Sequence, residues 1–142
     1  MHTFSTTKHV RLKAQFAAGA IDVAAGDAEQ TTVEIIPRHD DSRARELLER
    51  ARVTCTDHAD GHDVHIEIPE RWTWRGRTVP FDIRVRTPAG TDMDVTTAEA
   101  SFSAADAGSV NARSASGSIR IDRCRSARVS TASKVTRLKR SI

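Results

Sequence analysis

The chain has 142 residues and a formal net charge of +3, and 4% of its residues are aromatic. This length suits one structural domain, and a core with so few aromatic rings must be built from Val, Ile, Leu and Ala. We expect no membrane-spanning helix, because the sequence contains no run of about 18 apolar residues.

Two features bear on the cellular compartment. Residues 1–5 lack the basic and apolar regions of a secretory signal. Cys55 and Cys124 lie far apart in the sequence and give no disulfide framework. We therefore expect a cytoplasmic protein, unless an export signal has been removed.

Residues 1–88 predict a β-rich segment with one short helix. Apolar and polar residues alternate, as in half-buried strands, in four stretches: 10–14, 32–35, 64–68 and 81–85. Residues 59–61 are a turn signal that follows a strand starting at Val53. This segment should therefore contain several short strands and at least one hairpin.

A helix is predicted near 42–52. Asp40, Asp41 or Ser42 can cap its start with a side-chain oxygen. The apolar residues that follow have the i, i+3, i+4, i+7 spacing of a buried helix face: Ala44, Leu47, Leu48 and Ala51.

Residues 89–142 carry an internal repeat that predicts a short β-solenoid. The repeats begin 17 residues apart, at Met93, Val110 and Ala127, and cover 93–109, 110–126 and 127–142. In each repeat, alternating apolar residues flank a corner of small residues, as in two short strands joined by a tight bend. Such a unit cannot bury its inner face alone, so we expect the repeats to stack, one coil of about 17 residues per repeat. The two segments, 1–88 and 89–142, are expected to form one domain.

Two segments fit the repeat less well. Residues 19–23 echo residues 117–121, and they form either a further degenerate coil or part of a hairpin. The last repeat is degenerate, because Thr136 replaces an inward apolar residue. Its end either frays, caps the solenoid or pairs with another chain, since an uncapped end exposes strand edges.

Four motifs occur in a characteristic order: 18–23, 59–61, 81–91 and 114–121. Together they resemble the N-terminal portion of the bacterial DUF4097 family, whose members are labelled adhesins or β-strand-repeat proteins. The resemblance spans most of residues 1–125. It implies a repeat-containing β fold and a surface-binding role without a known ligand, and it carries over no catalytic residue.

Charge is concentrated at the C-terminal end. Residues 120–142 hold eight Lys or Arg and one acid, a net charge of +7, which leaves −4 for the preceding residues. A basic strip can attract nucleic acid or an acidic surface, and the candidate tail comprises Lys134, Arg137, Lys139 and Arg140. No aromatic residue accompanies the strip to stack bases, so we do not favour nucleic acid and regard a solvated tail as the simpler interpretation.

A candidate interaction patch lies in the segment 71–77, with two Trp among three Arg: Arg71, Trp72, Trp74, Arg75 and Arg77. In an extended chain the two indole rings share a face. Aromatic rings beside guanidinium groups suit recognition of a sugar, a peptide or an acidic partner. The alternative, which we favour, is that the rings cover the end of a thin core.

Four residues are spaced like a loose metal site: Cys55, His58, His62 and His65. His58 and His62 flank the predicted turn and can approach each other across a hairpin. Strand alternation, however, places His65 on the face opposite its apolar neighbours, and the register of Cys55 does not converge on the same point. We therefore expect solvated hairpin histidines and no metal site.

Catalytic motifs are absent from the sequence. It contains no Gly-rich phosphate loop, no nucleophile elbow and no zinc-protease motif. We therefore expect no enzyme, no catalytic residue and no cofactor.

The favoured function is a non-enzymatic β-solenoid scaffold or adhesin-like interaction module. Its expected partner is an unidentified protein or glycan, with self-association through the open solenoid end. The alternative is anion binding, of nucleic acid or an acidic surface, through the basic tail.

Overall fold

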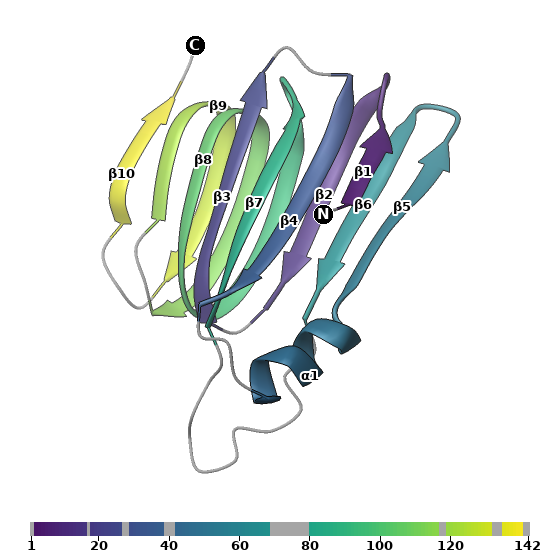
Figure 1. Ribbon diagram of the computed structural model, residues 1–142. Coiled ribbons are helices and arrows are strands. Elements are labelled where there is room, and N and C mark those ends of the chain that lie inside the picture. The colour runs from purple at the N-terminus through teal and green to yellow at the C-terminus, as the bar shows by residue number, and fades with distance from the viewer. Residues whose placement is uncertain are drawn as a thin grey trace.

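The computed structural model describes residues 2–16, 18–26, 29–38, 42–68, 80–116, 119–131 and 135–140 (Figure 1). The elements follow the chain in this order: β1 (His2–Ser5), β2 (His9–Gln15), β3 (Ala18–Gly26), β4 (Gln30–Pro37), α1 (Ser42–Arg50), β5 (Arg52–His58), β6 (Gly61–Glu67), β7 (Pro80–Pro88), β8 (Asp92–Ser116), β9 (Ile119–Thr131) and β10 (Val135–Arg140). Over these residues, the prediction of a mainly β fold with one short helix is confirmed.

The strands form one ten-stranded sheet within the described residues. Its path runs β1-β4-β7-β3-β8-β2-β6-β5, and β9 joins β8 to β10. The sheet curls into a nearly closed, barrel-like shape with two walls (Figure 1). One wall contains β1, β4, β7 and β3, and the other contains β2, β6 and β5. The long β8 belongs to both, because its first residues pair with β2 and its middle residues pair with β3.

The predicted β-solenoid is not confirmed as the overall architecture. Among the described strands, three pairs are antiparallel, namely β1 with β4, β4 with β7 and β5 with β6. Strands that alternate in direction cannot be successive coils wound in one sense, so the N-terminal strands close a barrel-like sheet instead.

Parallel pairing dominates where the repeat was found. β8 and β9 pair with Phe102 opposite Ile119 and with Val110 opposite Ala127, an offset equal to the 17-residue repeat. Between β9 and β10 the register is irregular. β3 lies on the other side of β8, also parallel, with Ile21 opposite Phe102. The hairpin alternative for residues 19–23 is therefore wrong.

The core fills the space between the two walls, since alternate residues of each strand point inward. The largest fully buried side chains are mostly branched aliphatic: Phe81, Leu12, Ile21, Ile66, Ile83, Ile119, Ile121, Val10, Val23, Val33, Val64 and Val85. Phe16, Phe81 and Phe102 contribute rings to this core, and its other members are mostly Val, Ile, Leu and Ala, as the composition predicts.

The helix α1 lies across one end of the sheet (Figure 1). Ala44 is fully buried, and Leu47 and Ala51 pack partly against the core. Leu48 is 36% exposed, so its predicted place on the buried face is wrong. Three apolar residues are enough for a helix of this length to cover the sheet end.

Gly19 is required where β3 meets β7. Its φ is +118°, and a Cβ at this position would collide with the backbone carbonyl of Phe81 on the neighbouring strand. Any other residue would be strained by the dihedral angle and by the contact together. This glycine therefore sets how closely the two strands approach.

Candidate functional site

An open groove of about 560 Å³ lies on the outer face of the wall formed by β5, β6, β2 and the start of β8. The groove follows from strand alternation. Most inward residues of these strands are apolar, with Val64, Leu12 and Met93 at most 2% exposed. The residues between them point outward and are polar. The groove floor is therefore the outer face of this wall, and the inner face of the same wall packs against the core.

Strand pairing arranges the outward residues in rows. One row runs from Asp63 on β6 through Arg11 on β2 to Asp92 on β8. The next row runs from His65 through Lys13 to Asp94 in the same order. Ser109 and Asn111, which lie further along β8, line the same groove.

Charges therefore alternate along the first row, and Lys13 lies beside Asp94 in the second. Arg11 Nη2 lies 3.7 Å from Asp60 Oδ2, and both side chains of this pair are exposed. Carboxylates supply acceptors, Lys13 supplies donors, and the amide of Asn111 supplies both. A groove of mixed charge suits an uncharged polar ligand better than a polyanion, which needs a uniformly positive surface.

Asp92 fixes the geometry of the groove edge. Its Oδ1 accepts a hydrogen bond from the backbone N–H of Ser109 at 2.8 Å, and its Oδ2 pairs with His9 Nε2 at 2.8 Å. Burial alone raises the pKa of Asp92, but the N–H of Ser109 and the imidazole of His9 lower it below the ordinary value. There is no room for a side chain at Gly108, because a Cβ would lie 2.5 Å from the carbonyl oxygen of Gly90 and 2.6 Å from Asp92 Oδ1.

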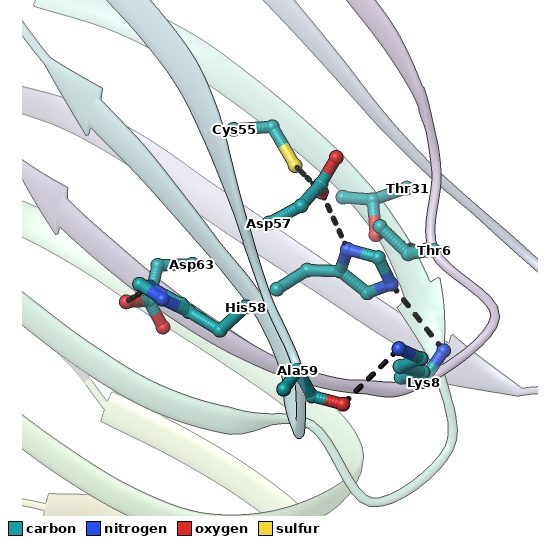
Figure 2. Close-up of polar contacts among 9 residues, drawn as sticks. Thr6, Lys8, Thr31, Cys55, Asp57, His58, Ala59 and Asp63 are labelled. Carbon is teal, nitrogen blue, oxygen red and sulfur yellow. Dashed lines mark hydrogen bonds and ion pairs between the residues drawn. The ribbon is translucent and has the colours of Figure 1, made fainter.

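A second polar site lies on the inner face of the β5–β6 hairpin. We call Cys55, Asp57 and His62 the hairpin cluster. Asp57 Oδ1 lies 2.6 Å from His62 Nδ1 and accepts a weaker hydrogen bond from Cys55 Sγ at 3.7 Å (Figure 2). The other ring nitrogen, His62 Nε2, accepts the backbone N–H of Lys8 at 3.4 Å. Two strands and the β1–β2 turn therefore meet at this imidazole.

The hairpin cluster shifts the ionisation of two of its members. The hydrogen bond from His62 is the largest cause of a lowered pKa at Asp57. Burial, followed by the charge of Asp57, raises the pKa of the Cys55 thiol. Cys55 is therefore a protonated hydrogen-bond donor near neutral pH.

The structure corrects two expectations about the histidines. His62 is 8% exposed and is not a solvated hairpin residue. Cys55 does converge with it, because Cys55 and Asp57 share the face of β5 on which Asp57 opposes His62.

The four residues of the loose metal site nevertheless do not come together. His58 points to the other side of the hairpin and pairs with Asp63 at 2.7 Å (Figure 2). His65 lines the outer groove. Asp57 was not among the candidates in the sequence, although its position two residues after Cys55 was the signal that could have found it.

The other predicted site residues are not tested by the structure. The patch of Arg71, Trp72, Trp74, Arg75 and Arg77 lies outside the described residues, as does Lys134. Arg137, Lys139 and Arg140 lie on β10, where the structure describes the backbone. Over the residues that the structure does describe, no helix has the length and apolar character needed to cross a membrane.

Comparisons with known proteins support the fold alone. No protein-family model matches the sequence, so the resemblance to DUF4097 depends on its motifs. No curated protein matches it either. Among solved structures, the chain is similar to a protein from Clostridium sporogenes described as a "putative cell adhesion protein", with a TM-score of 0.61 and 9% identity. The match covers 88% of this chain and 66% of the other, so this chain spans less than two thirds of its neighbour.

Proposed function

We propose that the protein is a non-enzymatic, adhesin-like interaction module that binds a neutral glycan in the outer groove. One observation carries the proposal: the groove is open and is lined by neighbouring positive and negative side chains on a hydrogen-bonded sheet. The fold is similar to that of a protein described as a "putative cell adhesion protein", which is consistent with this proposal.

The chemistry of the groove favours hydroxyl groups as ligand atoms. Carboxylates such as Asp63 and Asp94 accept hydrogen bonds, while Lys13 donates them. Asn111 can do both, which matches a hydroxyl that is donor and acceptor at once. Because the floor is a hydrogen-bonded sheet, little ordering is needed on binding, and this favours affinity.

The second part of the proposal concerns the parallel strands β8, β9 and β10. We take them as a short solenoid segment within the barrel-like sheet, because the β8–β9 offset equals the repeat length. In the described residues β10 pairs with β9 alone, and such an edge is a site for self-association.

A glycan array tests the function directly. Fluorescently labelled protein is applied to immobilised neutral and acidic glycans. We expect binding to neutral glycans, and we expect Lys13→Glu to weaken it by at least about tenfold.

Arg84→Glu is the matched control for this experiment. Arg84 is also an exposed strand cation, but it lies on β7 in the other wall. We expect binding by this variant to equal that of wild type. Binding to no neutral glycan, or equal losses in the two variants, would contradict the proposal. A preference for acidic glycans with a steep salt dependence would instead favour the basic tail.

A further inference from the structure

The hairpin cluster brings three different metal-binding atoms to one point. One ligand atom each from Cys55, Asp57 and His62 lies within 4.8 Å of the other two. Alternation along β5 places the first two on one face, and the antiparallel register places Asp57 directly opposite His62. The backbone of a two-stranded ribbon therefore holds all three.

The spacing is close to that of a tetrahedral metal centre. Zinc binds thiolate sulfur at about 2.3 Å and imidazole nitrogen at about 2.0 Å, which places neighbouring donor atoms about 3.5 Å apart. Asp57 Oδ1 already lies 3.7 Å from Cys55 Sγ and 2.6 Å from His62 Nδ1. Small side-chain rotations are enough to centre an ion among them.

The surroundings leave room for an open coordination position. The side chain of His62 is 10% exposed, whereas that of Asp57 is 74% exposed. The imidazole is thus held by the protein, and the carboxylate lies at the solvent boundary. Three protein ligands and one solvent-facing position are the arrangement of a zinc site that accepts a water or another ligand.

We propose that Cys55, Asp57 and His62 bind a divalent cation of the zinc class. A thiolate and an imidazole select such an ion over magnesium or calcium, which prefer oxygen ligands. The ion would link β5, an edge strand of the described sheet, to β6 near the hairpin turn. This proposal is independent of the glycan-binding proposal, because the cluster faces inward and the groove faces outward.

Hydrogen bonds join the three side chains in the metal-free cluster. A bound ion would take the place of the hydrogen atoms in these bonds. The thiol proton of Cys55 leaves to solvent as the thiolate binds the metal. The imidazole proton moves through solvent from Nδ1 to Nε2, since Nδ1 must offer its lone pair. The long hydrogen bond from Lys8 N–H to Nε2 is then lost, so the turn between β1 and β2 must adjust. Binding releases one proton and is weaker in acid.

Cobalt(II) is the probe that reports the sulfur ligand. The full-length protein is titrated with Co²⁺ under reducing conditions, and the thiolate-to-cobalt charge-transfer absorption is followed. We expect a band that saturates at one ion per chain and is displaced by Zn²⁺ but not by Mg²⁺.

Four variants identify the ligands. We expect Cys55→Ser to abolish the band, and Asp57→Ala and His62→Gln to weaken Co²⁺ binding by at least about tenfold. Asp57→Ala keeps the test valid if His62→Gln impairs folding, because the Asp57 side chain is exposed. Cys124→Ser, which removes the other thiol, should leave the band unchanged. An absent band in wild type, a band that survives Cys55→Ser, or one lost in Cys124→Ser would overturn the proposal.

Discussion

Two neighbouring residues of β2 show the difference between the faces of one wall. Leu12 points inward, is 1% exposed and contacts the core between Val64 and Met93. Lys13 points outward into the groove, between His65 and Asp94. The same backbone therefore carries a face that stabilises the fold and a face that is free for binding. Substitutions on the inner face should lower stability, whereas substitutions on the outer face should weaken binding and leave stability nearly unchanged.

The inner face should show the largest effect on stability. Leu12→Ala removes a buried side chain from the centre of the wall, and we expect the free energy of unfolding to fall by about 3 to 4 kcal/mol. Urea unfolding followed by circular dichroism measures this change. A loss below about 1 kcal/mol would mean that the wall repacks easily and that the two faces are not energetically distinct.

The close contact of β3 with β7 should show the next largest effect. Gly19→Ala adds a Cβ against the carbonyl of Phe81 at a positive φ, and we expect a loss of about 2 to 3 kcal/mol. Gly26→Ala, in the same strand, is the control, because its Cβ would meet no atom within 4 Å. Equal unfolding free energies for the two variants would show that the approach of the strands is not tight.

Asp92 lies at the groove edge, and its contribution to stability should depend on pH. Its pKa is lowered in the folded state, so the ionised carboxylate stabilises the fold above the unfolded pKa of about 3.9. That contribution is lost as the pH falls through the lower folded value.

We expect Asp92→Asn to cost roughly 1 kcal/mol at neutral pH, since the side chain is partly exposed. The same variant should reduce the acid dependence of stability between about pH 5 and about pH 2. Urea titrations at several pH values give both numbers. An unchanged pH slope would show that the bonds to Ser109 and His9 do not stabilise the folded state.

The outer face should show the smallest effect on stability. Lys13→Glu alters an exposed side chain, and we expect a change within about 0.5 kcal/mol. Its unfolding curve should overlay that of wild type, while its glycan binding should be weaker by at least about tenfold. A loss of stability as large as that of Leu12→Ala would mean that the groove residues are structural.

Local pattern was a good guide to the strands and to one register. Alternation predicts the strand around Leu12, and the 17-residue spacing equals the offset between β8 and β9. The apolar spacing in the helix wrongly predicted that Leu48 is buried. The buried face of this short helix is narrower than the spacing of its apolar residues suggests.

Long-range pairing could not be predicted in the same way. β2 lies between β6 and β8, although about 45 residues or more separate it from either along the chain. Nothing in the periodicity of a strand specifies a distant partner, because any apolar face can pair within a sheet. The groove and the hairpin cluster both depend on such pairing. His62 and Asp57 were recognisable as polar residues near a turn, but not as neighbours on the inner face.

Mapping the bound glycan onto the protein would show whether the groove is the binding face. Backbone amide chemical shifts are recorded by NMR with and without the best neutral glycan from the array. We expect the largest changes at residues 11–13, 63–65 and 92–94 of the groove wall, with residues 82–86 of β7 unaffected. Changes concentrated on β7, or in the segment 71–77, would contradict the assignment of the groove as the binding face.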